Sequence, residues 1–326
     1  QVETVVSGLQ GPWGLAVDGT NLYIAERNGG KVSVLDLTAP EDGTTDFVTG
    51  ITNPSDLTLG GGMLYIGERE GNDILVADLS SPTPEVVTTA SNYITGLELL
   101  GDDLYFCKSL GDTVYVADVS SGFPTANTAF AGGLDGPYGI AIHGTDMYVA
   151  DDDAGKVMKI DMTASTPEAV DFKNYPAPNG VEIYGDLLYV ADYNSSAGAI
   201  YQINVITDDV ELLALSLSGP LAFAIYNDEL YFSEFNGDKV SKLSLGVGID
   251  ENESADKASI YPNPSSDQVY IIGMETGAEY VIYSLDGKEV ASGTISEDGM
   301  IDIQSLAKGS YNIQFDGTKS VRFVKE

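Results

Sequence analysis

The peptide Leu22-Tyr-Ile-Ala-Glu26 is the first of six closely similar stretches in this sequence. The others begin at Leu64, Leu104, Met147, Leu188 and Leu230, so the spacings are 42, 40, 43, 41 and 42 residues. Each copy lies between two further apolar segments, and most repeats contain a fourth. Four short strands in each unit of about 40 residues are typical of a β-propeller blade. The repeat therefore predicts an all-β, six-bladed β-propeller.

The first residues of the chain are expected to close this ring. The sixth repeat supplies only three strands before residue 246, whereas Val2-Glu-Thr-Val-Val6 precedes the first complete repeat. We predict that residues 2–6 form the outer strand of the sixth blade, because closure of this kind leaves no open sheet edge.

The repeats resemble those of NHL-type six-bladed propellers over roughly residues 1–247. The match is closest along Gly136-Pro-Tyr-Gly-Ile-Ala-Ile142, Met147-Tyr-Val-Ala-Asp151 and Gly155-Lys-Val-Met-Lys-Ile160. The resemblance implies the fold but not the activity, since such propellers include binding modules, lyases and lactonases.

The charge of the chain excludes several classes of partner. Its 326 residues contain 15 Lys and Arg and 50 Asp and Glu, which gives 15 − 50 = −35. Nucleic acid and anionic membrane surfaces need clustered basic residues, so neither is an expected partner. No apolar run approaches the roughly 18 residues of a membrane span, so we expect no transmembrane segment.

A second domain is expected after the ring. We predict a propeller over residues 1–248, an acidic linker over 249–256 and a small Ig-like β-sandwich over 257–326. The last segment contains alternating strand-like stretches such as Gln268-Val-Tyr-Ile-Ile272 and Tyr311-Asn-Ile-Gln-Phe315, and turns such as Asp286-Gly287.

This segment resembles the type A C-terminal sorting domain of type IX secretion substrates. The resemblance is carried by Ile260-Tyr-Pro-Asn-Pro-Ser-Ser-Asp267, Tyr283-Ser-Leu-Asp-Gly-Lys288, Ile303-Gln-Ser-Leu-Ala-Lys-Gly-Ser-Tyr311 and Phe323-Val-Lys325. It implies export to the cell surface or beyond by the outer-membrane machinery of Bacteroidetes-type bacteria. The sorting-signal residues that it implies are Tyr261, Pro262, Asn263, Pro264, Gly287, Gly309, Tyr311 and Lys325.

Alignment of the six repeats separates recurring residues from exceptional ones. The second strand ends in an acid in five repeats, at Glu26, Glu68, Asp151, Asp192 and Glu234. This recurrence indicates a structural role, and we expect these acids to accept hydrogen bonds from backbone N–H groups of the next turn. The single cysteine, Cys107, occupies a position of small residues and is expected to be a buried, inert thiol. His143 is the only histidine, and its position predicts a variable turn.

The start of each first strand is expected to line the axis of the ring. Trp13, Tyr138 and Asn179 stand out at this position, and aromatic faces beside an amide suit a glycan, a peptide or a small-molecule ligand. Asp56 interrupts a Gly/Ala position on the same strands.

Two glutamates occupy a position that other repeats fill with Ala or Thr. Glu98 and Glu182 need partners, because burial of an unpaired charge costs several kcal/mol. One interpretation points them into the channel, where they hold a cation together with Asn179 or have raised pKa values. The alternative is that both accept hydrogen bonds from tyrosine hydroxyls.

The evidence for a metal centre is mixed. Pro178-Asn-Gly180 resembles the Asn-Gly that carries a metal ligand in the gluconolactonase and regucalcin family, but Leu221 and Gln10 occupy the positions of the other ligands. Asp151-Asp-Asp153 lacks the alternating pattern of a calcium loop, which favours a solvated acidic turn. Ca²⁺ or another divalent cation therefore stays open as a cofactor.

We therefore favour an exported, non-catalytic binding or adhesion module over an enzyme. The expected partners are the type IX export machinery and a ligand at the channel mouth. The alternative is a metal-assisted lactonase or lyase that uses Asn179, Glu182, Glu98 and Asp56.

Overall fold

The computed structural model divides the chain into two compact units, Gln1–Val247 and Gly248–Glu326. The structure describes residues 1–90, 93–120, 122–193, 197–245, 259–261, 268–272, 277–284, 288–296, 300–315 and 319–325. The expected linker over 249–256 lies outside these ranges. None of the described residues forms a helix that is long and apolar enough to cross a membrane.

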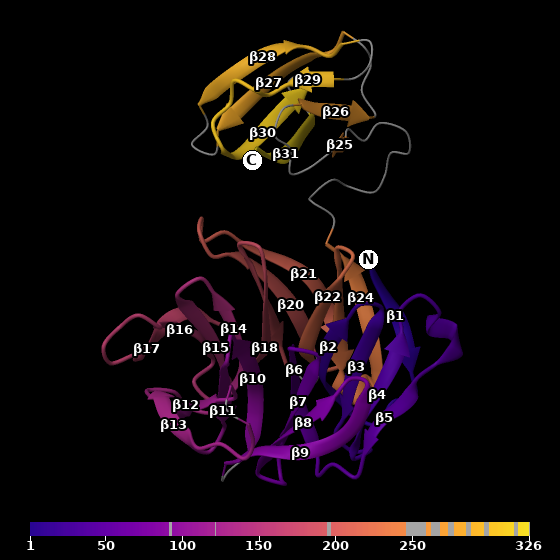
Figure 1. Cartoon of the computed structure of the whole chain (residues 1–326), viewed down its shortest axis with the longest axis vertical. Coiled ribbons are helices and arrows are strands. Elements are labelled where there is room, and N and C mark those ends of the chain that lie inside the picture. Colours follow the sequence, from indigo (N-terminus) through magenta and orange to yellow (C-terminus); the bar gives the residue numbers. More distant parts are fainter. Residues whose placement is uncertain are drawn as a thin grey trace. The chain divides into compact units, whose positions relative to one another are not determined.

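The described residues of the first unit form six four-stranded antiparallel sheets arranged around a common axis (Figure 1). The first strands are β2 (Pro12–Asp18), β6 (Pro54–Gly60), β10 (Ile94–Leu100), β14 (Pro137–His143), β18 (Pro178–Tyr184) and β22 (Pro220–Tyr226). The second strands are β3 (Asn21–Glu26), β7 (Met63–Glu68), β11 (Asp103–Lys108), β15 (Asp146–Asp151), β19 (Leu187–Asp192) and β23 (Glu229–Glu234). The third strands are β4 (Lys31–Asp36), β8 (Asp73–Asp78), β12 (Thr113–Asp118), β16 (Lys156–Asp161), β20 (Gly198–Asn204) and β24 (Lys239–Ser244).

The outer strands complete each sheet and close the ring. Five follow their own blades: β5 (Thr45–Thr49), β9 (Ser81–Thr89), β13 (Asn127–Ala131), β17 (Ala169–Asn174) and β21 (Val210–Leu217). The sixth is β1 (Val2–Ser7), which pairs antiparallel with β24. The predicted closure by residues 2–6 is therefore confirmed. Strand β2 packs against both β6 and β22, so the first and last blades are neighbours.

Glycine allows neighbouring first strands to approach closely. A Cβ atom at Gly139 would lie only 2.8 Å from the carbonyl oxygen of Asn179 on the next blade. Gly14, Gly96 and Gly180 meet the backbone of the following blade in the same way. Such distances exclude a side chain at these positions, so the apolar faces of adjacent sheets pack tightly around the axis.

The recurring acids hold the loop that enters the blade in five of the six described sheets. Glu26 accepts a hydrogen bond of 2.7 Å from the Gln10 backbone N–H, and the other four acids make the equivalent bond to Thr52, Asp135, Ala177 and Ser218. The structural role is as predicted, but the predicted donors in the next turn are wrong. In the first blade, that turn's N–H groups already bond to backbone carbonyls. Asp151 is 1% exposed, so the solvated turn expected there is also wrong for this residue.

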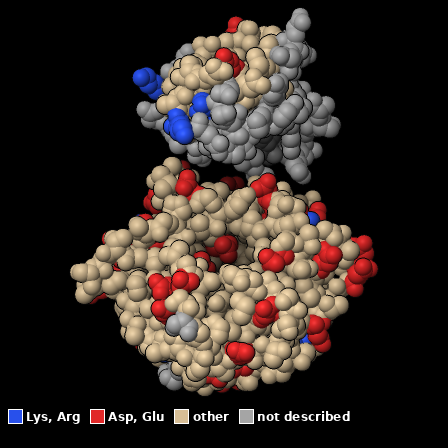
Figure 2. Space-filling view, viewed as in Figure 1, with Lys and Arg blue, Asp and Glu red and all other residues tan. Residues whose placement is uncertain are grey.

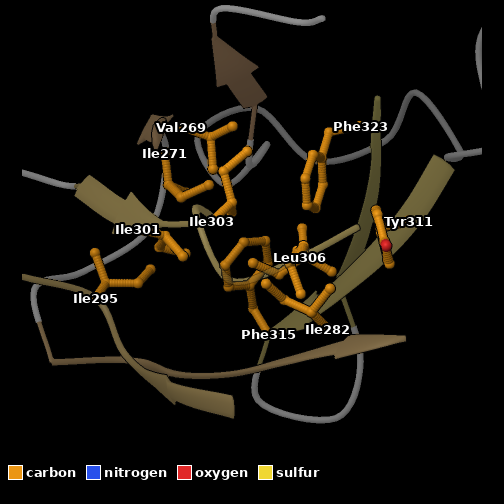
Figure 3. Packing of buried hydrophobic residues seen from close by; sticks show 11 residues of the cluster. Val269, Ile271, Ile282, Ile295, Ile301, Ile303, Leu306, Tyr311, Phe315 and Phe323 are labelled. Carbon is orange, nitrogen blue, oxygen red and sulfur yellow. The ribbon is translucent and has the colours of Figure 1, made fainter. Parts of the chain in front are cut away.

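The second unit is a two-sheet sandwich. One sheet contains β25 (Ser259–Tyr261), β26 (Gln268–Ile272) and β29 (Met300–Asp302), and the other contains β28 (Glu289–Thr294), β27 (Glu279–Ser284), β30 (Gly309–Phe315) and β31 (Lys319–Lys325). Figure 3 shows the apolar core between them, in which Ile301 and Val269 of one sheet face Ile282, Phe315 and Phe323 of the other.

Disruption of β1 should weaken the ring. Val6 packs against the core cluster between the first and last blades, whereas Glu3 on the same strand is exposed. Val6→Asp should lower the free energy of unfolding by about 2 kcal/mol, because it places a carboxylate against this cluster. Urea denaturation of the full chain measures the effect, with Glu3→Gln as the control. Equal unfolding midpoints for the two variants would contradict closure by β1.

Candidate functional site

The axis of the ring contains a cavity of about 300 Å³. Its wall comes from all six first strands, and Figure 2 shows the ring hollowed at its centre with acidic side chains in the hollow. The six residues proposed from the sequence all line this cavity: Trp13, Asp56, Glu98, Tyr138, Asn179 and Glu182. The structure therefore brings the candidates together, whereas their role in binding stays a prediction.

A local irregularity directs several of these side chains. In every blade the register between the first and second strands shifts after the first residue of the first strand, which is a proline in five blades and Ile94 in the third; in the first blade the shift lies between Pro12 and Leu15. Such a shift is typical of a β-bulge, which turns the inserted residues out of the normal alternation. Trp13, Asp56, Tyr138 and Asn179 all lie within these irregular segments.

Two aromatic rings close one end of the cavity. Trp13 comes from the first blade and Tyr138 from the fourth, which lies across the axis, and their rings stack with centroids 6.3 Å apart and an angle of 11° between planes. Trp13 is 8% exposed. Both rings line the cavity at the end of the axis where the first strands begin, and their role as ligand contacts at a channel mouth stays a prediction.

Arginine residues cover this aromatic pair. The Arg69 guanidinium carbon lies 5.0 Å from the Trp13 ring centroid and 5.3 Å from that of Tyr138, and its Nη2 donates a hydrogen bond of 3.0 Å to the Tyr138 hydroxyl. Arg27 also lies 5.0 Å from the Trp13 ring. Cation–π contacts of this kind stabilise the stacked pair of Trp13 and Tyr138, which we call the aromatic plug. The Arg69 Nη1 atom is buried and has no partner among the described residues.

Sequence reasoning missed the two arginines, although a signal was present. The chain has arginine only at positions 27, 69 and 322, and two of these directly follow the recurring acid of a blade. The same position holds Ser109, Asp152, Tyr193 and Phe235 in the other blades. A residue type this rare at a variable position beside the axis was a stronger functional indication than the recurring acids.

The polar groups in the cavity wall differ in whether they have partners. The Thr95 hydroxyl donates to the Pro137 carbonyl over 2.7 Å, and the Ser55 hydroxyl donates to the Gly67 carbonyl over 3.1 Å. The Thr95 bond therefore joins the third blade to the fourth, and the Ser55 bond joins two strands of the second blade. Asn179 is only 5% exposed, and its side chain has no hydrogen-bond partner within the described part of the chain. A buried amide without a partner indicates space for a ligand or for water.

The Asp56 side chain binds the backbone of the next blade. Its Oδ2 atom accepts a hydrogen bond of 2.9 Å from the Leu97 N–H. The close approach that glycine allows elsewhere explains this bond, because Asp56 stands at the glycine position of the second blade. Burial nevertheless raises the pKa of Asp56 to about 7, since the bonds from Leu97 and Leu57 only partly offset the loss of water.

The two glutamates share the cavity with Asp56. Burial raises the pKa of Glu98 well above its ordinary range, and the charges of Glu182 and Asp56 raise it further. Burial likewise raises the pKa of Glu182 to about 7, with a smaller contribution from Asp56. The predicted raised pKa values thus follow from desolvation first and mutual repulsion second.

The tyrosine alternative fails for these glutamates. Glu98 pairs with Tyr105 and Glu182 with Tyr189 in the strand register, but neither tyrosine hydroxyl donates to its glutamate. The Tyr189 hydroxyl is buried without a partner among the described residues.

The acids of the cavity do not converge on a single point within the part of the chain that the structure describes. Among the described residues, no three His, Cys, Asp or Glu side chains converge closely enough to hold an ion. Asp56, Glu98 and Glu182 come from the second, third and fifth blades and are therefore distributed around the axis. A divalent cation needs several oxygen ligands within about 2.6 Å, which this distribution does not supply.

The remaining candidates lie outside the cavity or serve the cores. Cys107 is fully buried, and burial, followed by the charges of Asp151 and Asp56, raises its pKa, as expected of an inert thiol. His143 lies 3.2 Å from Asp186 at the end of β14. In the sandwich, Tyr311 is buried, stacks on Phe323 and donates to the Ala307 carbonyl.

Several of the predicted sorting-signal residues cannot be placed. Pro262, Asn263, Pro264 and Gly287 lie outside the described residues. Tyr261 belongs to β25, and Gly309 and Lys325 mark the paired ends of β30 and β31.

The second unit is identified by its sequence family. Residues 259–325 match the secretion system C-terminal sorting domain. The chain is therefore exported by the type IX secretion system, to the cell surface or into the medium, and it engages that machinery through this domain. Its assignment to Bacteroidetes stays a prediction. A comparison with curated protein sequences finds no match.

Solved structures place the first unit among the propellers. A gluconolactonase from Xanthomonas campestris is 15% identical, with a TM-score of 0.60, and the match covers 74% of this chain and 89% of that one. A virginiamycin B lyase from Staphylococcus aureus, solved with quinupristin, is 15% identical, with a TM-score of 0.56 over 83% and 95%. A calcium-binding regucalcin from Agrobacterium tumefaciens is 13% identical, with a TM-score of 0.56 over 73% and 91%. Identities this low establish the fold alone, and the NHL assignment stays a prediction.

The cavity acids should make the protein less stable as pH rises. Their pKa values are higher in the folded state than the roughly 4 of an unfolded chain. The folded state therefore binds more protons, so this contribution to stability is complete below pH 4 and is lost as pH rises through about 7. Urea denaturation at pH 5 and pH 8 measures the loss.

The triple variant Asp56→Asn, Glu98→Gln, Glu182→Gln should reduce the difference between the two pH values. The control removes the same charge from exposed positions, as Glu85→Gln, Glu168→Gln, Glu211→Gln. If the control reduces the pH dependence as much as the cavity variant, general repulsion in an acidic protein explains it and the cavity acids do not.

Proposed function

We propose that the ring is a non-catalytic binding or adhesion module that takes a ligand into its axial cavity after export. The observation that carries this proposal is the unpartnered Asn179 amide in the wall of an otherwise closely packed ring. A cavity of about 300 Å³ is at the lower end of the range of small-molecule sites. The aromatic plug gives that cavity a fixed end against which a ligand packs.

A metal-assisted lactonase or lyase is the second candidate. Carboxylates with raised pKa values favour it, because such groups serve as general acids and bases. The relatives named above include a lactonase and a lyase, which shows that this ring geometry is compatible with such enzymes. The distribution of the acids around the axis favours binding instead, since no three of the described acids approach one another as metal ligands do.

Trp13 provides a direct test, because it is the only tryptophan and forms the end wall of the cavity. Glycans, peptides and small metabolites are titrated into the full chain while its fluorescence is recorded. A ligand that enters the cavity should change this signal saturably. Asn179→Ala should weaken that ligand about tenfold through loss of a hydrogen bond, and Asn174→Ala on the exposed edge of the fourth blade should leave it unchanged.

Two outcomes separate the candidates. Binding without turnover, unaffected by a chelator of divalent ions, is the result that the binding module predicts. Turnover of a bound ligand that is abolished by the chelator and restored by Ca²⁺ would replace the binding module by the enzyme. If no ligand in the panels changes the Trp13 signal, the axial cavity is not the binding site.

A further inference from the structure

We propose that the axial cavity selects a small linear diamine or polyamine, bound by the Asp56, Glu98 and Glu182 carboxylates and the Asn179 amide. This inference rests on the proposed binding function and names its ligand class. It begins from the composition of the cavity wall, in which three carboxylates face a shared space.

Within the described ranges, no basic side chain pairs with these carboxylates. Arg69 stacks on Trp13 and Tyr138 and is not among the residues that line the cavity, and its charge acts on Asp152. Asp56 has only backbone donors, and no side-chain hydrogen bond to Glu98 occurs within the described residues. Carboxylates in this state are stabilised by a cation that brings its own N–H donors into the cavity.

The Asn179 amide is a second, separate indication that a ligand occupies this cavity. Its side chain is more than nine-tenths buried, lines the cavity and has no partner among the described residues. The amide oxygen accepts hydrogen bonds as a carboxylate does, so it adds a fourth acceptor for ammonium donors. Asn179 also belongs to the fifth blade, as Glu182 does, so acceptors occur at more than one depth of that wall.

The separation of the acids favours several linked ammonium groups over a single ion. The acids come from three blades and do not converge, so a metal ion or a single ammonium group does not reach all of them. Leu57, Leu97 and Val181 lie beside the three acids in the cavity wall and supply apolar contacts for methylene groups between charges. A chain of alternating ammonium and methylene segments matches both features.

The open end of the cavity is itself acidic. First strands run from the plug toward the turns that join them to the second strands, and five of these six turns carry acids: Asp18, Asp102, Asp103, Asp146, Asp186, Asp228 and Glu229. Lys159 pairs with Asp146, Lys242 with Glu229 and His143 with Asp186, which leaves an excess of negative charge. Such a rim concentrates cations at the entrance and repels anions.

Titration calorimetry with 1,4-diaminobutane and spermidine tests the proposal on the full chain at 150 mM salt. We expect one molecule bound per chain, with the Trp13 signal changing at the same concentrations. Neutral 1,4-butanediol, which has the same length, should not bind. Glu98→Gln and Glu182→Gln should each lower the affinity for both amines at least about tenfold. Glu211→Gln, on the exposed face of β21, should leave this affinity unchanged.

The dependence on pH provides a second readout. Binding should strengthen between pH 6 and pH 8 as Asp56 and Glu182, with pKa values of about 7, lose their protons. Other titratable groups of the described chain that line or adjoin the cavity include Glu98, Tyr138 and Tyr184 in its wall, Tyr105 and Tyr189 paired with the two glutamates, Cys107 near Asp56, and Arg69 over the aromatic plug. Alkylammonium groups keep their charge across this range, as Lys does. Urea denaturation verifies that the glutamine variants remain folded, and loss of like-charge repulsion should leave them at least as stable as the parent.

Three results would overturn the proposal. One is binding of several amines per chain that Glu98→Gln does not alter, which indicates condensation on an acidic surface. Another is equal binding of butanediol. The third is an uncharged or anionic ligand whose binding depends on Asn179, together with no binding of either amine. This outcome would contradict the proposed ligand class but not the proposed binding function.

Discussion

When six sheets pack face to face around one axis, their backbones leave an open space at the centre of the ring. Glycine at the contact positions of the first strands brings the blades as close as their carbonyl groups permit, and side chains must occupy what remains. At Asp56 a carboxylate takes the place of that glycine and reaches the backbone of the next blade. The ring therefore fixes both the size of the cavity and the positions from which polar groups enter it.

The two ends of the axis differ in chemistry because different parts of the repeat reach them. At one end, Trp13 and Tyr138 meet across the ring beneath Arg69, so aromatic stacking and cation–π contacts close the channel. At the other, the short turns after the first strands carry acids. The result is a pocket with one closed end, three acids in its wall and an acidic entrance, which explains why the observations favour a cationic ligand.

The repeat was sufficient to predict the ring, its closure by residues 2–6 and the residues that line the axis, because strand period and repeat length are local properties of the sequence. The pairing of Trp13 with Tyr138 was not predictable in this way, since it joins blades on opposite sides of the ring. The tyrosine partners considered for Glu98 and Glu182, and the loops that the recurring acids hold, lie within single blades, but they depend on side-chain directions that an alignment of repeats does not give. Arg69 was visible in the sequence as a rare residue, but only its contacts reveal its position over the plug.

The central claim is that Asp56, Glu98 and Glu182 lie in the axis without a compensating charge. Carbon-13 NMR of their labelled carboxyl groups, assigned through Asp56→Asn, Glu98→Gln and Glu182→Gln, measures this most directly. Asp56 and Glu182 should titrate with pKa values of about 7 in the ligand-free protein, with Glu98 also shifted upward. Titration of all three near the ordinary value of about 4 would contradict the account, because it would mean that water or a cation already satisfies them.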